Sequence, residues 1–326
     1  MPIKTPKFWV KRNIISFALL PLSFIYFLAM LLDRYSKKSQ KISKPVICIG
    51  NFIAGGSGKT PTAIAIGKIL QESFAECKFA YLSSGYKGKG ADFISLQEEN
   101  YEAKNVGDEP LLLNEIAPTF ISKNRLFGAK QIDKINEIKA VILDDGMQNK
   151  TLHQDLVIAV VDGKIAFGNE FLIPAGPMRQ PLNMALKTVD FVVIIGETEE
   201  KVIKKLSDKK ITKAKIVATN LEKFSGQKLI AFCGLAYPEK FFSFLEKNGL
   251  EIINKKSFSD HYFYQNQDLE KLCEMSKNKG AKLVTTKKDW IKFPDNFQKE
   301  IDYLDINLEF LDKEFIKNEL KKVLSF

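Results

Sequence analysis

The sequence has few of the residues that build metal centres and disulfide frameworks. It contains 326 residues but only two histidines and four cysteines. The cysteines are scattered, at Cys48, Cys77, Cys233 and Cys273, and no two of them form a C-x-x-C pair. This spacing excludes the usual zinc motifs and predicts no disulfide framework, so we expect a protein of a reducing compartment. Internal repeats and low-complexity tracts are also lacking, which excludes a repeat array.

Acidic residues are the minority among the charged side chains. The 49 Lys and Arg residues outnumber the 39 Asp and Glu residues and give a formal net charge of +10 at pH 7. Such an excess favours a polyanionic partner, either a nucleotide, a phospholipid surface or nucleic acid. The 45% hydrophobic content is enough for one large core or two smaller ones, and the length favours two lobes.

The most informative segment is a glycine-rich loop directly after an apolar run. Residues 50–61 read GNFIAGGSGKTP. Glycines let backbone N–H groups close around a polyphosphate, Lys59 can reach the outer phosphates, and the Thr60 hydroxyl can bind Mg²⁺. Ile53 replaces the first glycine of the general pattern, and a Gly-rich connection with a solvated lysine is the alternative. We predict a site for ATP or GTP, made of Ala54, Gly55, Gly56, Ser57, Gly58, Lys59, Thr60 and Pro61.

An uncharged, mostly apolar stretch lies near the N-terminus, at residues 13–32. About 20 apolar residues span a bilayer, so we expect residues 1–34 to form a membrane-anchor helix. Basic residues flank the stretch on both sides, which suits anionic lipid headgroups and does not decide the orientation. A cleaved signal peptide and a buried core helix kinked at Pro21 are the alternatives.

Apolar, β-rich runs alternate with helical stretches through the rest of the chain. The runs lie at residues 46–49, 79–82, 140–143, 156–161 and 191–195. This alternation predicts an α/β fold with a mostly parallel, P-loop NTPase-like sheet. We expect this nucleotide-binding lobe at residues 35–220 and a smaller α/β lobe, which closes over the cleft, at residues 221–326.

Carboxylates follow one of the predicted strands. Residues 141–146 read VILDDG, and a P-loop sheet places the acid that holds Mg²⁺ at the end of such a strand. An Asp-Asp-Gly turn is the alternative. We predict that Thr60, Asp144 and Asp145 are the metal ligands.

Two other patterns admit both a catalytic and a structural interpretation. Asp108 and Glu109 precede an apolar helical run in a GDEP segment, where acids either cap the helix or act in catalysis. His261 lies beside Asp260 in an aromatic-rich run, where an imidazole can tune a base, contact a phosphate or simply pack. His153 has a weaker context, and we expect it to be structural.

Two loops can bind an anionic substrate. Residues 83–90, SSGYKGKG, follow a predicted strand, although a lysine-bearing surface turn has the same composition. Residues 172–179 end in Arg179, a side chain suited to a phosphate or a carboxylate.

The order of these motifs resembles the tetraacyldisaccharide 4′-kinase family of lipid A assembly, from the apolar N-terminal stretch to about residue 293. The resemblance is carried by GN-x4-GGSGKTP at residues 50–61, SxGY at 83–86, GDEP at 107–110, DDGMQN at 144–149, GN…PAGPMR at 168–179, CGLAYPEKFF at 233–242, SDH at 259–261 and VTTKKD at 284–289. The family's phosphate loop has the spacing seen here, which accounts for Ile53.

The resemblance implies transfer of the ATP γ-phosphoryl group to the 4′-hydroxyl of a tetraacylated disaccharide 1-phosphate, with ATP and Mg²⁺ as cofactors. It implies that Asp108 accepts the sugar proton, that His261 orients or tunes Asp108, and that Lys59 stabilises the β- and γ-phosphates. It also implies that the disaccharide phosphate is bound by Tyr86, Arg125 and Gln148.

The implied location is the inner membrane, with the active site on its cytoplasmic face, and neither nucleic acid nor an obligate protein partner is expected. Because Lys59 and His261 lie in different lobes, closure of the cleft should gate turnover. The chain departs from the family pattern at Met147, Ser84 and Gln180, and the last two departures put substrate contacts in doubt. A membrane-tethered nucleotide switch and a soluble small-metabolite kinase are the alternative functions.

Overall fold

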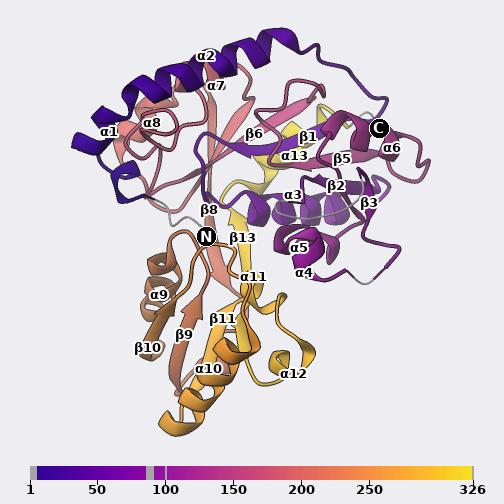
Figure 1. Ribbon diagram of the computed structural model, residues 1–326. Helices are drawn as coiled ribbons and strands as arrows, with labels where there is room; N and C mark the ends of the chain where they lie inside the picture. Colours follow the sequence, from indigo (N-terminus) through magenta and orange to yellow (C-terminus); the bar gives the residue numbers. More distant parts are fainter. Residues whose placement is uncertain (1–5, 86–91, 100, 325–326) are drawn as a thin grey trace.

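The structure, a computed structural model, describes residues 6–85, 92–99 and 101–324 and has two α/β lobes (Figure 1). The larger lobe is built on a nine-stranded sheet. Its strands, from one edge to the other, are β13 (Ile306–Phe310), β8 (Lys210–Ala218), β7 (Phe191–Ile195), β6 (Leu156–Asp162), β1 (Val46–Asn51), β5 (Ala140–Asp144), β2 (Phe79–Ser83), β4 (Thr119–Ile121) and β3 (Ile94–Ser95). Only the edge pairs β13–β8 and β3–β4 are antiparallel, so the predicted α/β class with a mostly parallel sheet is confirmed.

Both faces of the large sheet are covered, because successive side chains of a strand point to opposite faces. In β1, Ile47 and Ile49 enter one apolar core, whereas Val46 and Cys48 enter the other. The first core is closed by α3 (Lys59–Ser73), α5 (Asp108–Asn114) and α13 (Lys313–Lys321), and the second by α6 (Arg125–Asp133), α7 (Leu182–Leu186) and α8 (Glu200–Lys205). The short helix α4 (Ala103–Val106) packs beside β3 and β4.

The smaller lobe has a four-stranded, fully parallel sheet. Its order is β10 (Glu251–Ser257), β9 (Lys228–Cys233), β11 (Lys282–Thr286) and β12 (Asp302–Leu304). One face packs on α9 (Pro238–Lys247) and η2 (Leu221–Phe224), and the other on α10 (Asn266–Lys279) and α12 (Asp295–Gln298). Helix α11 (Lys287–Trp290) directly follows β11 and contacts α5 of the larger lobe.

The end of the chain differs from the expected division at residue 220. Strand β13 pairs with β8 in the large sheet, and α13 inserts Ile316 and Leu320 into the large-lobe core. The chain therefore passes between the lobes twice, through β8 and through β13 (Figure 1). The pairing joins two strands that are separated in the sequence by the whole small sheet.

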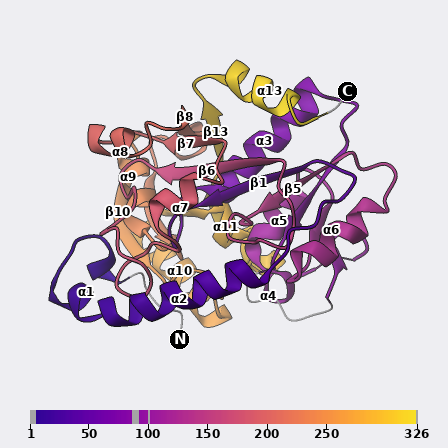
Figure 2. The same cartoon turned by 90° about the horizontal axis from the view of Figure 1, so that it is seen from above.

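The expected membrane-spanning anchor at residues 1–34 is wrong. After η1 (Lys7–Trp9), the apolar stretch forms two helices, α1 (Ile14–Ala18) and α2 (Leu20–Ser36), and no helix among the described residues is long and apolar enough to cross a membrane. The division follows from Pro21, which has no N–H for the carbonyl of Phe17. Helix α2 lies along the outside of the large lobe (Figure 2).

The packing of α3 on β2 gives a stability prediction. A Cβ atom at Gly67 would lie 2.0 Å from the hydroxyl oxygen of Tyr81, whose buried side chain donates a hydrogen bond to the Ala63 carbonyl at 3.0 Å. We expect Gly67→Ala to lower the free energy of unfolding by about 1–3 kcal/mol, despite the helix propensity of alanine. Urea unfolding measures the change.

The matched control is Ser73→Ala, at an exposed position of the same helix, which should change the unfolding free energy by less than about 0.5 kcal/mol. Equal unfolding midpoints for Gly67→Ala and the native protein would show that Tyr81 moves aside without cost, contrary to this prediction.

Candidate active site

The loop between β1 and α3 is held in a fixed shape by its own residues. Gly58 has φ +90°, and a Cβ atom there would lie 2.4 Å from Ile195 Cδ1, so this position requires glycine. The side chain of Asn51 crosses the loop and donates to Ser57 Oγ at 2.8 Å. Helix α3 begins at the next residue, Lys59, and directs its positive end at the loop. This geometry is suited to a phosphate chain.

Two carboxylates at the end of β5 face the loop. The Thr60 hydroxyl donates to Asp144 Oδ2 at 3.3 Å, and Lys59 Nζ lies 3.6 Å from Asp145 Oδ2. Arg179 binds Asp145 through two parallel hydrogen bonds of 2.7 and 3.0 Å. The structure thus brings together the predicted metal ligands Thr60, Asp144 and Asp145, and adds Arg179 as a fixed cation.

The two carboxylates have opposite protonation behaviour. Burial, and then the neighbouring Glu109, raise the pKa of Asp144 to about 7. Asp145 is also buried, but Lys59 and Arg179 lower its pKa to about 2. Among the described residues the buried Asp144 Oδ1 atom has no hydrogen-bond partner, although most buried polar atoms have one.

This donor set fits Mg²⁺. The ion binds proteins through one or two carboxylates and completes its coordination with waters and substrate phosphates. Within the described part of the chain no three His, Cys, Asp or Glu side chains form a metal cluster by themselves, so phosphate oxygens would have to supply the remaining ligands. The unpaired Asp144 oxygen and the hydroxyl of Thr60 are the groups available on the protein side.

A second pair of groups meets across the two lobes. Asp108 is the first residue of α5 and is buried, and His261 follows β10 in the smaller lobe. The His261 Nδ1 atom lies 3.0 and 3.1 Å from the two carboxylate oxygens of Asp108. His261 has φ +54°, a left-handed conformation that is unusual for a residue with a side chain. The predicted pair is therefore in direct contact.

Lys288 of the smaller lobe determines how His261 binds Asp108. Its Nζ atom lies 3.3 Å from His261 Nε2 and 3.0 Å from Glu109 Oε1. An ammonium group only donates, so Nε2 accepts and Nδ1 carries the hydrogen that is donated to Asp108. Burial raises the pKa of Asp108, but Lys288, His261 and Lys292 together hold it well below its usual range. Asp108 is accordingly a carboxylate at neutral pH.

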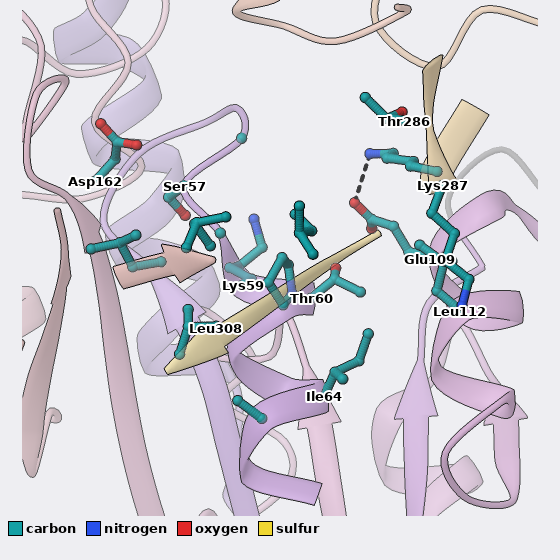
Figure 3. Close-up of a pocket in the computed structure, with 18 of the residues that line it drawn as sticks. Ser57, Lys59, Thr60, Ile64, Glu109, Leu112, Asp162, Thr286, Lys287 and Leu308 are labelled. Carbon is teal, nitrogen blue, oxygen red and sulfur yellow. Dashed lines mark hydrogen bonds and ion pairs between the residues drawn. The ribbon is translucent and has the colours of Figure 1, made fainter. Parts of the chain in front are cut away.

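One cavity of about 1080 Å³ lies between the lobes, and groups of both line it, including Lys59, Asp145, Arg179, His261 and Lys288. Asp108 does not line it and lies against the lining residue His261. The eight loop residues predicted to bind ATP, at positions 54–61, line it. In Figure 3, Lys59 and Thr60 of the larger lobe lie across from Thr286 and Lys287 of the smaller lobe, with Glu109 between them. A polyphosphate on one wall would face the carboxylate–imidazole pair on the other.

The remaining predicted binding residues have different positions. Gln148 accepts from Arg179 Nη1 at 2.9 Å, and so lies next to the site. Arg125 is buried, with Nη1 2.7 Å from the Ser122 carbonyl oxygen and Nη2 3.4 Å from that of Asp144. Tyr86 lies outside the described residues.

Of the departures from the family pattern, Ser84 lines the cavity, whereas Met147 and Gln180 are buried. His153 is half exposed and lies beside Asp155 at the surface, as expected for a residue outside the site.

Sequence reasoning assigned no role to several residues of the site. The sequence pattern does not show which of the adjacent acids Asp108 and Glu109 has a role in the site. In the structure, Glu109 lines the cavity. Lys288 and Lys292 were not singled out either. A signal for them exists, because they follow the carboxyl end of a predicted strand, where α/β sheets place ligand contacts.

Comparisons with known proteins agree with this geometry. The sequence model of the family described as Tetraacyldisaccharide-1-P 4′-kinase matches residues 15–325. Similar proteins include the tetraacyldisaccharide 4′-kinases of Rickettsia felis, 37% identical over 97% of this chain and 96% of that protein, and Gluconobacter oxydans, 34% identical over 96% and 95%. The solved structure of LpxK from Aquifex aeolicus in complex with ATP superposes with a TM-score of 0.77 over 96% of this chain and 100% of that chain. Its sequence identity is 24%, so this likeness concerns the fold.

The loop geometry predicts the effect of removing Lys59. We expect Lys59→Ala to raise the Kd of a slowly hydrolysed nucleoside triphosphate by about 10- to 150-fold, because a charged hydrogen bond contributes about 1.5–3 kcal/mol. Titration calorimetry in the presence of Mg²⁺ gives the Kd.

Lys139→Ala is the control, since Lys139 is exposed and precedes β5 at the end of the strand opposite to the site. A Kd that is the same for both variants would remove Lys59 from the phosphate site.

Proposed function

Because the chain belongs to the tetraacyldisaccharide 4′-kinase family and is a kinase of lipid A biosynthesis, we propose which of its residues bind ATP, hold the sugar and move the proton. One observation carries the proposal. Asp108 and His261, from different lobes, are 3.0 Å apart, and His261 lines the same cavity as the phosphate loop. This is where an alcohol must meet the terminal phosphate of a nucleotide.

ATP binds with its β- and γ-phosphates in the loop at residues 54–61, and Lys59 turns from Asp145 towards the phosphates. Lys59 Nζ already lies at the loop, in an ion pair of 3.6 Å with Asp145, so it needs only a short movement to reach the phosphates. This position supports the assignment. The solved structure of the Aquifex aeolicus LpxK contains ATP, which supports ATP over GTP.

The 4′-hydroxyl of the acylated disaccharide 1-phosphate donates a hydrogen bond to Asp108. The hydroxyl oxygen forms a bond to the γ-phosphorus, the bond from that phosphorus to the oxygen of ADP breaks, and the hydroxyl proton passes to Asp108. Transition states of this kind are loose and carry their charge on the equatorial phosphoryl oxygens. The role of Asp108 is therefore mainly to orient the hydroxyl, and Lys59 and Arg179 stabilise the developing charge.

Thr60, Asp144 and Asp145 are the residues that would hold Mg²⁺. When bound, the ion neutralises charge on the β- and γ-phosphates. On the protein side, the Arg179 pair keeps the Asp145 carboxylate in a fixed orientation.

The disaccharide phosphate is bound near the wall that holds Arg179. Gln148 supports this assignment, because its side chain is already bonded to Arg179. Tyr86 completes the proposed substrate contacts, and Arg125 acts on the substrate without touching it. Arg125 contributes from a buried position behind Asp144, so its effect on the substrate is electrostatic.

The N-terminal helices lie in the surface of the membrane and do not span it. Ser16 and Ser23 are buried, and the Tyr26 hydroxyl donates to the Arg179 carbonyl at 2.8 Å, so one face of these helices packs on the protein. The opposite face exposes large apolar side chains: Ile14, Ile15, Phe17, Leu20, Leu22, Phe24, Ile25, Leu28 and Leu32. An apolar face flanked by basic residues is typical of interfacial helices.

This arrangement supports a location on the inner membrane, with the cavity on the cytoplasmic side where ATP is available. The Tyr26 hydrogen bond links the interfacial helix to the residue that pairs with Asp145, so the lipid surface and the phosphate site are adjacent. A nucleotide switch that transfers no phosphoryl group to an alcohol would not need the contact between Asp108 and His261.

The proton-transfer assignment predicts the kinetics of Asp108→Asn. Positioned bases contribute about 10²–10⁴-fold, so we expect kcat to fall by about that factor while the affinity for ATP is retained. The assay incubates the full chain with γ-labelled ATP, Mg²⁺ and the disaccharide 1-phosphate, and follows labelled lipid by chromatography.

The control is Asp208→Asn, at an exposed turn, which should keep the native kcat. Loss of ATP affinity with unchanged turnover in Asp108→Asn would reject the assignment of Asp108 as the proton acceptor. Omitting Mg²⁺ should abolish transfer in every variant.

Charged residues on α2 should weaken membrane binding. Phe24 and Ile25 are each 61% exposed, and burying such a side chain contributes about 1.5–3 kcal/mol. We expect the double change Phe24→Asp and Ile25→Asp to reduce binding to vesicles that contain anionic lipid by at least about tenfold, as measured by sedimentation.

Phe127→Asp is the matched control, because Phe127 is a 40% exposed aromatic residue on α6 of the same lobe. Vesicle binding that survives the α2 changes, in protein that still binds ATP, would contradict an interfacial role for α2.

A further inference from the structure

The Asp108 carboxylate is approached by a buried cation of the smaller lobe. Lys292 Nζ lies 3.7 Å from Asp108 Oδ2 and 2.7 Å from Asp289 Oδ1, and the Lys292 and Asp289 side chains are 1% and 0% exposed. Asp289 also accepts from the Gly234 N–H at 2.8 Å and the Thr286 hydroxyl at 2.9 Å. Lys292 is therefore held on a rigid, fully buried acceptor that belongs to its own lobe.

A second lysine of the same segment controls the other member of the pair. Lys288 Nζ reaches His261 Nε2 at 3.3 Å and Glu109 Oε1 at 3.0 Å. Lys288 and Lys292 are four residues apart, at α11 and just beyond it, so one short segment contacts both the imidazole and the carboxylate. Lys292 and Asp108 are buried, and buried charges are costly to place in a protein unless each is paired.

We propose that Lys288 and Lys292 are positioning residues for phosphoryl transfer: Lys288 holds His261 through Nε2 in the tautomer with hydrogen on Nδ1, and Lys292 holds the Asp108 side chain through an ion pair across the lobe boundary. The inference rests on the proposed function, which makes Asp108 the proton acceptor. It adds a reason for closure, because the acceptor is completed by cations that the smaller lobe supplies.

The charges around Asp108 explain why these cations are needed. The charged or titratable groups that face Asp108 are His261, Lys288 and Lys292 of the smaller lobe and Glu109 of its own helix. Burial and Glu109 both favour the protonated acid, which cannot accept a proton. Lys288 pairs with Glu109 and offsets its negative charge. Lys292, whose side chain is buried, favours the charged form of Asp108. Both lysines belong to the smaller lobe, so they offset the burial of Asp108 where that burial exists, in the closed cleft.

The chain offers a direct test, because it has only two histidines and His153 is a surface reference. Protein labelled with ¹⁵N-histidine is studied in complex with a non-hydrolysable ATP analogue and Mg²⁺. Long-range ¹H–¹⁵N spectra then report which imidazole nitrogens carry hydrogen. We expect His261 of the native protein to carry hydrogen on Nδ1 alone at neutral pH.

In Lys288→Met, His261 Nε2 loses the Lys288 ammonium as a donor, so its signal should move to the position of a protonated nitrogen. The kcat should fall at least about tenfold, a loss typical of a displaced positioning group. Lys288→Arg should restore the native spectrum and most of the activity, because the cation returns.

Lys287→Met is the matched control. Lys287 is the neighbouring residue and pairs with Glu115 across the same lobe boundary, so its loss weakens the boundary without removing a contact of the Asp108–His261 pair. It should leave the His261 spectrum native. A native His261 spectrum in Lys288→Met, or equal changes in both methionine variants, overturns the inference.

Lys292→Met leaves Asp289 and Asp108 buried without their cation, and this variant can fail to fold. If it folds, its kcat should fall with ATP affinity retained; retained kcat overturns the role of Lys292. The Lys288 variants test the inference in either case. The Lys288 side chain is 20% exposed, so replacing it does not leave a fully buried charge unpaired and should not prevent folding. Failure of the proposed function has a different signature: Asp108→Asn would then stay active, whatever the His261 spectrum shows.

Discussion

The site depends on one carboxylate that is buried where the two lobes meet. Asp108 begins α5 beside another acid, and burial opposes its ionisation. The groups that reverse this effect, His261 and two lysines, all come from the smaller lobe. The division into two lobes therefore matters to the proposed chemistry, since the phosphate loop belongs to one lobe and the charges around Asp108 come from both.

The parts of the site that were predictable from sequence are those whose chemistry is local. A phosphate loop needs a strand, a glycine-rich turn and the start of a helix, and these are contiguous at residues 46–61. The acids at the end of β5 follow the same logic. Asp108 and His261 are 153 residues apart, and each alone has an ordinary structural interpretation, so only the resemblance to a family paired them. Lys288 lies in the VTTKKD segment that carries the resemblance but was given no role, and Lys292 lies outside the quoted segments.

The N-terminal stretch shows a different limit of sequence reasoning. Mean apolar character is a property of composition, whereas spanning a bilayer requires one uninterrupted helix whose sides are all apolar. Pro21 interrupts the helix, and two serines and a tyrosine turn one of its sides towards the protein. The expectation of contact with lipid thus survives as a proposal, while the expected geometry does not.

The return of the chain through β13 has a consequence for how the protein is made. Strand β8 is synthesised early, but the strand that covers its open edge is encoded after the entire small sheet. During translation the backbone groups along that edge stay unpaired until the ribosome has produced the smaller lobe, and uncovered edges of this kind invite pairing with other chains. The nascent larger lobe is thus left with an unpaired strand edge, and β13, the last strand of the chain, pairs with it.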